Sequence, residues 1–342
     1  MKNTNKTSIY DVLLRLPLAR CWLPAPCACA LMLGSPLIFA QSAASFPTKP
    51  LRIVMGFTPG GTSDLVARSV GQKLTEAWGQ QVIVENRPDG ASNIAAELVA
   101  RAAPDGYTLL LVTVANTINV ALYPKLAFDI EKDFAFVTNV ATTPNIIVVN
   151  SALPARNVKE LVAIAKSRPN ELHHGSTGIG TPQHLAGEIF KAMAAVKMIH
   201  VPYKGAVGAL TDVLAGQIEI FVGAVPSVVT HVESGRLRAI GVSSLKRAAV
   251  LPKVPTIDEQ GLRGFETASW FGFAVPAATP RDVVSKLQSE MARGVTRPDF
   301  RSRMNGAGAE VIANSSEEYT AYIKSEIAKW GRAVKLSGAT PG

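Results

Sequence analysis

The stretch Gly56–Asp64 combines glycines, hydroxyls and a carboxylate in one short turn, with the sequence Gly-Phe-Thr-Pro-Gly-Gly-Thr-Ser-Asp. Gly60 and Gly61 lack the Cβ atoms that would keep a ligand away from the backbone. If Thr62 or Ser63 caps a helix, the first N–H groups of that helix point outward and the helix dipole favours an anion. The stretch therefore indicates an anion site. The alternative is a capped helix start whose glycines serve only the turn.

Regular elements flank this turn on both sides. Leu51–Met55 is an apolar, β-branched run of strand length, and the pattern after the turn places Val66, Val70 and Leu74 on one helix face. Strand and helix patterns keep alternating along the chain, which predicts a mostly parallel sheet with helices on its faces. The other strands are expected at residues 81–85, 107–113, 145–149, 172–176, 198–201, 218–222, 238–242 and 269–275.

A second strand-to-helix turn with glycines lies at Thr177–Thr181. Thr181 is a good helix cap there, and Pro182 suits the first helical position. Residues 114–124, with two asparagines and a proline, are expected to form a loop. A capping box at residues 315–318 opens the C-terminal helix.

Composition limits the possible partners. The chain of 342 residues is long enough for two α/β domains, and 47% hydrophobic with 18% charged residues is ordinary for a globular protein. The formal net charge is +9, yet no Lys/Arg run carries interleaved aromatic residues, which argues against nucleic acid. A mildly basic protein is compatible with anionic solutes.

Residues 1–44 are typical of a secretory signal peptide, with a basic opening, an apolar run broken by prolines and then small residues. Cleavage is expected between Ala40 and Ser45, which would release the protein into the periplasm; the alternative is an uncleaved anchor. The exported chain would have no disulfide and no thiol nucleophile, because this segment holds all three cysteines, Cys21, Cys27 and Cys29.

Motifs for catalysis are not found. The sequence has no Gly-x-Ser-x-Gly elbow, phosphate loop, dinucleotide fingerprint or His-Glu-x-x-His, so no enzyme, cofactor or metal is expected. His173 and His174 are adjacent, and on a strand they would point to opposite faces. His184, His200 and His231 are isolated in the sequence, and a structural or surface role is the interpretation for all five histidines.

Six short motifs follow one another along the chain, at residues 49–64, 84–88, 103–109, 200–205, 251–256 and 269–272. Together they resemble the tripartite tricarboxylate transporter solute-binding proteins, also called the Bordetella uptake gene family. The resemblance runs from Phe46 to Lys335, and its specificity comes from the order of the motifs, since any one alone would be weak.

This resemblance implies a two-lobed periplasmic binding protein fold of type II-like form, each lobe a mostly parallel sheet flanked by helices. The chain would cross twice between lobes, with residues 45–143 and 268–342 in lobe 1 and residues 144–267 in lobe 2. A monomer would capture a small carboxylate in the interlobe cleft and deliver it to a tripartite-type membrane permease. The rival functions are a ligand-loaded partner of a signalling receptor and an enzyme on the same fold.

The resemblance also implies a set of ligand-binding residues. Backbone amides around Gly60 and Gly61 would hold one carboxylate, and later loops would supply further amides and hydroxyls. For Asp64 the alternative role is a charge that suits the helix dipole, and for Lys204 it is a surface cation. The full set is Phe57, Pro59, Gly60, Gly61, Thr62, Ser63, Asp64, Val114, Ala115, Asn116, Ser176, Gly178, Gly180, Thr181, Tyr203, Lys204, Gly205 and Gly223.

Two departures from the family pattern bear on the ligand. Many members have a Gly-Thr-Ser-Gly-Thr-like run where residues 112–117 here are more apolar. Many members also carry an acidic residue after the strand at 218–222, where this chain has Gly223, Ala224 and Val225. Because such an acid can neutralise an ammonium group, its absence favours a bulkier apolar carboxylate over an amino acid.

Overall fold

The structure, a computed structural model, describes residues 46–89, 91–337 and 339–340. The predicted signal peptide and the three cysteines lie outside these residues, so those predictions stay open. Among the helices of the described ranges, none is both long enough and apolar enough to cross a membrane. The division into two lobes likewise remains a prediction.

Parallel strands connected by helices begin the fold. β1 (Leu51–Met55) lies between β2 (Val82–Asn86) and β3 (Thr108–Thr113), and all three run in the same direction. α1 (Thr62–Trp78) and α2 (Asn93–Ala100) make the two crossovers. The last five residues of β3 are all buried, as expected for a strand covered by helices on both faces.

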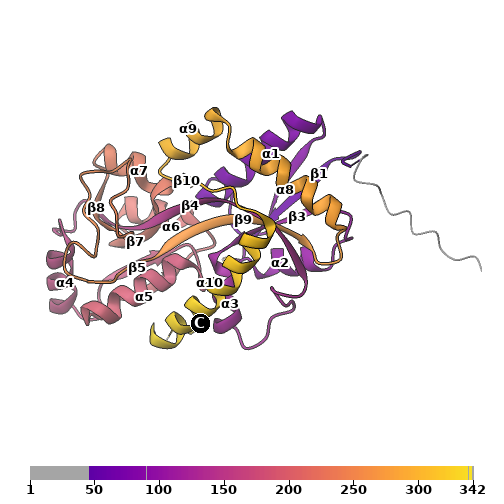
Figure 1. Ribbon diagram of the computed structural model, residues 1–342. Helices are drawn as coiled ribbons and strands as arrows, with labels where there is room; N and C mark the ends of the chain where they lie inside the picture. The colour runs from indigo at the N-terminus through magenta and orange to yellow at the C-terminus, as the bar shows by residue number, and fades with distance from the viewer. Residues whose placement is uncertain (1–45, 90, 338, 341–342) are drawn as a thin grey trace, which may run out of the picture. The chain divides into compact units, whose positions relative to one another are not determined.

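Two strands, β4 (Phe134–Asn150) and β9 (Ala268–Pro276), lie side by side in antiparallel pairing (Figure 1). Residues 134–144 of β4 pair with β9, and residues 145–150 pair with β7 (Ile220–Ala224) and β8 (Leu237–Val242). β9 pairs with β3 on its other edge, and the short β10 (Glu310–Val311) adds to β4. The 17-residue β4 therefore takes part in both groups of strands.

A second parallel group completes the sheet. β5 (His173–Ser176) lies between β6 (Ile199–Pro202) and β7, which gives the strand order β2-β1-β3-β9-β4-β7-β5-β6. The prediction of a mostly parallel sheet holds within each βαβ group and is wrong for the strands that join the groups. β4 and β9 run antiparallel to every strand beside them, so the sheet is mixed.

Helices cover the sheet and enclose four apolar clusters. One cluster packs α1 and α8 on the first strand group, a second packs α2, α3 and α10 on its other face, and two more lie under α4–α5 and α6–α7. The remaining elements are α3 (Val114–Leu122), α4 (Val158–Ser167), α5 (Pro182–Ala194), α6 (Ala206–Ala215), α7 (Val225–Glu233), α8 (Arg281–Val295), α9 (Pro298–Gly306), β10 (Glu310–Val311) and α10 (Ser316–Ser337).

The loop predicted at residues 114–124 is wrong, because most of it forms α3. The polar side chains that suggested a loop find partners inside the protein. Asn116 Oδ1 accepts the N–H of Thr113 at 2.9 Å, and Asn119 Nδ2 donates to Ala91 O at 2.7 Å. The apolar residues between them face the core, and Ile118 is fully buried.

Helix caps were predicted with mixed success. Thr181 Oγ1 accepts from the N–H of His184, with Pro182 first in α5, and the capping box of Ser315 and Glu318 is present, as predicted. The prediction that Thr62 or Ser63 caps α1 is wrong. Gly61 is the N-cap, and no side-chain cap bond forms there among the described residues.

Candidate functional site

A cavity lies where the carboxyl ends of strands meet the starts of helices. Its volume is about 40 Å³. Small-molecule sites span roughly 300–1,000 Å³, so this cavity must open further to admit a ligand. The lining residues are Phe57, Thr58, Gly61, Thr62, Ser63, Thr113, Val114, Thr177, Pro182, Gln183, Gly205, Ala206, Ala224, Ser227, Ser269, Trp270 and Phe271.

Of the described helices, α1, α3, α5, α6 and α7 all begin at this cavity. The N-caps of four of them line it, namely Gly61, Thr113, Gly205 and Ala224, and α5 contributes Pro182 at its first position. Each helix N-terminus is equivalent to about half a positive charge. The backbone therefore creates a positive potential in the cavity.

The glycine and alanine caps leave donors free for a ligand. At the starts of α1, α6 and α7, no side chain of the cap residue accepts a hydrogen bond within the described structure. Free N–H groups at a helix start are the usual donors for a bound carboxylate or phosphate. Gly61 and Gly205 also add no side chain of their own that would cover the backbone, and at Gly61 the nearest atom to an added Cβ is Ala206 Cβ at 3.7 Å.

Two threonine hydroxyls on the lining add to these donors. Thr58 Oγ1 and Thr62 Oγ1 are buried, and neither has a hydrogen-bond partner among the described residues. The Thr113 side chain is instead part of a capping box with Asn116. A buried hydroxyl without a partner costs free energy, on the order of 1–3 kcal/mol, which a polar ligand could offset.

The rest of the lining is largely apolar. Phe57, Val114, Trp270 and Phe271 contribute the large apolar side chains. Trp270 is 1% exposed, and its Nε1 donates to Glu326 Oε2 at 2.8 Å, which fixes the indole ring. Each described residue on the lining is apolar, a glycine, a hydroxyl residue or the amide Gln183, and none is ionisable.

Gln183 is held by a buried polar network instead of being free to rotate. Its Nε2 donates to Asn145 Oδ1 at 2.9 Å and to Ser269 Oγ at 2.8 Å, and its Oε1 accepts from Thr177 Oγ1. Asn145 lies in β4 and Ser269 in β9. The network therefore ties the start of α5 to both long strands beside the cavity.

Removing one orphan hydroxyl tests its role. Thr62→Val is expected to lower carboxylate affinity roughly fivefold, about 1 kcal/mol, because a ligand hydrogen bond is lost. The unliganded protein should keep or gain stability, since the variant removes a buried hydroxyl that has no partner among the described residues. Calorimetric titration and urea unfolding of the same samples measure both effects. Unchanged affinity in a stable variant would contradict the assignment of this hydroxyl to the site.

Residues 66–338 match the family described as "tripartite tricarboxylate transporter family receptor". The chain belongs to this family. The family prediction from the sequence motifs is thus confirmed, and the family is one of transport receptors.

Solved structures agree with this membership. The chain is similar to Rpa4515 of R. palustris with adipate, at 34% identity and a TM-score of 0.84, covering 87% of this chain and 100% of that one. It is similar to the periplasmic binding protein BugD at 33% identity and a TM-score of 0.83, covering 86% and 99%. MatC of Rhodopseudomonas palustris with bound malate is 29% identical with a TM-score of 0.81, covering 84% and 100%. The predicted periplasmic binding protein fold is confirmed.

Of the ligand-binding residues implied by the family resemblance, one group lines the cavity. Two of the predicted loops meet there, because Thr58 N–H donates to Lys204 O at 3.2 Å. Gly205 packs against Thr58 so closely, at φ +152°, that a side chain at this position would collide with the Thr58 hydroxyl. The predicted residues on the lining are Phe57, Gly61, Thr62, Ser63, Val114 and Gly205.

The other predicted residues are not on the lining, and their ligand role remains a prediction. Asp64 accepts from Gly60 N–H and is paired with Arg68, which fits its alternative role at the helix start. The Tyr203 hydroxyl donates to Asp212 at 2.6 Å, and Lys204 is exposed. The residues off the lining are Pro59, Gly60, Asp64, Ala115, Asn116, Ser176, Gly178, Gly180, Thr181, Tyr203, Lys204 and Gly223.

Sequence reasoning missed several lining residues. Most of them directly follow a strand or occupy the first turn of a helix, and that position is the signal that could have found them. Trp270 and Phe271 entered only as part of a family motif, without a role. Thr58 and Thr177 fall within the two predicted glycine turns without being named as ligand contacts. The other lining residues outside the predicted set are Thr113, Pro182, Gln183, Ala206, Ala224, Ser227, Ser269, Trp270 and Phe271.

The histidines are not isolated in space, contrary to how the sequence presents them. The rings of His184 and His200 stack at 4.2 Å between centroids, and His174 stacks on His200 at 5.0 Å. Burial lowers the pKa of His184 to about 4 and the pKa of His200 to about 3. Burial would raise the pKa of Glu188, but the neighbouring His174 ring and the hydrogen bonds from Lys191 lower it to about 2.

Proposed function

We propose that this receptor captures a small carboxylate that carries no ammonium group and binds it in the cavity at the five helix N-termini. The observation that carries the proposal is the combination of those N-termini with the unpartnered Thr58 and Thr62 hydroxyls on the described lining. Helix N-termini are favourable for anions, and the hydroxyls can donate to carboxylate oxygens.

The lining also supports the ligand class. An amino acid would bring an ammonium group into a cavity whose described lining has no carboxylate, and an unpaired buried charge costs several kcal/mol. An apolar part of the ligand would instead gain about 25 cal/mol for each Å² removed from water against residues such as Trp270 and Phe271. The adipate bound by the similar Rpa4515 is a carboxylate of this kind.

We further propose that the cavity is the cleft between the two predicted lobes. Its lining residues fall within the segments 57–63, 113–114 and 269–271 and within the segments 177–183, 205–206 and 224–227. The first set falls in the predicted lobe 1 and the second in lobe 2, with β4 and β9 passing between them. Closure about these two strands would enclose the ligand by a hinge movement.

The proposed role is capture in the periplasm and delivery to a membrane permease, without catalysis. Family membership supports the transport role. The described lining supports binding over chemistry, because its hydroxyl and amide groups do not exchange protons readily near neutral pH.

A thermal-shift panel tests the ligand class. Purified protein is melted with amino acids, aliphatic dicarboxylates and aromatic carboxylates, since a tight ligand must raise the melting temperature. A saturating carboxylate at about 100 times its Kd should stabilise the fold by roughly 2.7 kcal/mol. Stabilisation by an α-amino acid, with none from carboxylates that lack the amino group, would overturn the proposed ligand class.

A further inference from the structure

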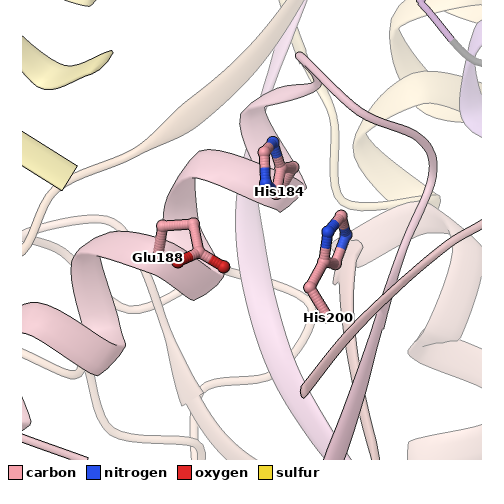
Figure 2. Close-up of side chains that lie close together, drawn as sticks. All are labelled: His184, Glu188 and His200. Atoms are coloured by element: carbon pink, nitrogen blue, oxygen red, sulfur yellow. The ribbon is translucent and has the colours of Figure 1, made fainter. Parts of the chain in front are cut away.

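Four ionisable side chains gather between α5 and the strands β5 and β6, none of them on the cavity lining. His184 and Glu188 are one helical turn apart on α5, so they share one face of the helix. His174 lies in β5 and His200 in β6, in paired positions of neighbouring strands. Figure 2 shows the Glu188 carboxylate and the rings of His184 and His200 turned toward one another.

The three groups in Figure 2 approach the spacing that one shared ion requires. One ligand atom from each of His184, Glu188 and His200 lies within 4.8 Å of the others. A tetrahedral zinc ion with bonds of about 2.0–2.2 Å requires ligand atoms roughly 3.3 Å apart, so the groups must move closer together. Glu188 and His200 are only partly buried, which leaves them room to move and gives an ion a route from solvent.

We propose that His184, Glu188 and His200 form a binding site for a divalent transition-metal ion, with zinc as the representative metal. Two imidazoles and one carboxylate suit zinc, copper or nickel better than magnesium or calcium, which prefer oxygen ligands. Three protein ligands leave a fourth position for water or a small molecule, as in zinc sites with two histidines and one glutamate.

Hydrogen bonds already orient one of the rings. His200 Nε2 lies 2.7 Å from Ser176 Oγ, and a proton donated there leaves Nδ1 as the metal-binding nitrogen. Such a bond on the far side of a ligating imidazole fixes its tautomer and raises its basicity. His184 Nδ1 accepts from the Gly180 N–H at 3.3 Å, a long bond that coordination by His184 would break. The two rings are stacked 18° from parallel, so at least one must rotate for its lone pair to reach the ion.

His174 provides a second, independent indication. Its side chain is fully buried, and neither ring nitrogen has a hydrogen-bond partner among the described residues. Its Nε2 lies 3.5 Å from Glu188 Oε1. A small movement would let this ring donate a hydrogen bond to Glu188 and orient the carboxylate toward the ion. Metal-ligating carboxylates commonly accept such a hydrogen bond from a neighbouring residue.

Lys191 is the competitor for the same carboxylate. Its Nζ donates to both oxygens of Glu188, at 2.9 and 2.8 Å. An ion at Glu188 must therefore displace a long, flexible cation from at least one oxygen. Removing the charge of Lys191 should therefore strengthen metal binding. A cluster with only a structural role would not show this increase in affinity.

One loop connects the proposed metal site to the cavity. Ser176 and Gly180, which bond the two rings, begin and end the segment that leads into α5. Thr177 lies in that segment and lines the cavity, as does Pro182 just beyond it. The metal proposal does not depend on which solute binds in the cavity, and the two can be tested separately.

The test is zinc titration of the purified protein, carrying no histidine tag and stripped with a chelator beforehand. Calorimetry should find a site in the micromolar range or tighter, and Co²⁺ should give the intense visible absorption of a tetrahedral complex. His184→Gln and His200→Gln should each weaken zinc binding at least tenfold. Lys191→Gln should tighten it severalfold, because Glu188 loses its competing cation.

His173→Gln and His231→Gln are the matched controls, since both remove an imidazole outside the three ligands and should leave zinc affinity unchanged. Circular dichroism without metal checks that each variant is folded, and if one ligand variant fails to fold, the other and Lys191→Gln decide. No zinc binding by the wild-type protein at 100 times the expected Kd would overturn the proposal. Equal affinity of the wild-type protein and a folded His184→Gln or His200→Gln variant would also overturn it.

Discussion

Replacing Gly61 with valine is expected to weaken carboxylate binding at least tenfold, which corresponds to roughly 1.4 kcal/mol or more. Gly61 is the N-cap of α1 and lines the cavity, so the added methyl groups would occupy space that the carboxylate must approach. Its backbone has φ −87° and ψ 179°, a conformation that valine adopts readily. The nearest atom to an added Cβ is Ala206 Cβ at 3.7 Å, an ordinary contact, so the fold should survive.

Isothermal titration with the ligand found in the panel measures this effect. Gly306→Val is the matched control, because an added Cβ there has nothing within 4 Å among the described residues and the position is not on the lining. If the folded Gly61→Val protein binds the carboxylate as tightly as the Gly306→Val protein does, the first glycine turn is not part of the site.

The first part of the site could be predicted because its chemistry is local. Strand, glycine turn and helix are consecutive in Gly56–Asp64, so the sequence alone places free N–H groups at a strand end. The same argument worked for the turn before α5, where Thr181 and Pro182 occupy the predicted cap and first position. Prediction was wrong at α3, where Asn116 Oδ1 and Asn119 Nδ2, in a segment expected to be a loop, find backbone partners inside the protein.

The remaining lining could not be predicted, because it depends on long-range pairing. Trp270 and Ser269 reach the cavity only because β9 inserts between β3 and β4, and Gln183 is fixed only by partners in both β4 and β9. The histidine cluster has the same origin. His174, His184 and His200 meet because β5 pairs with β6, and α5 lies between these two strands in the sequence. The spacing of the three histidines along the sequence does not predict this contact.

Replacing Glu326 with alanine is expected to destabilise the folded protein by about 3–5 kcal/mol, the largest stability effect among these variants, because two hydrogen bonds to a charged acceptor are lost. Glu326 is 4% exposed, and its Oε2 accepts hydrogen bonds from Trp270 Nε1 and Trp330 Nε1, each at 2.8 Å. The change leaves two buried indole N–H groups without this acceptor and creates a void in the cluster under α10. Because Trp270 also lines the cavity, ligand affinity should fall as the ring loses its anchor.

Urea unfolding followed by tryptophan fluorescence measures the loss of stability. Glu326→Gln separates charge from hydrogen bonding, because its amide oxygen can still accept from both indoles, and it should recover most of the stability. Glu317→Ala is the matched control on the same helix, where the exposed carboxylate contributes only a helix-dipole interaction of about 0.3–1 kcal/mol. A Glu326→Ala protein no less stable than the Glu317→Ala protein would show that the two indoles find other acceptors, and that the acid does not hold Trp270 against the cavity.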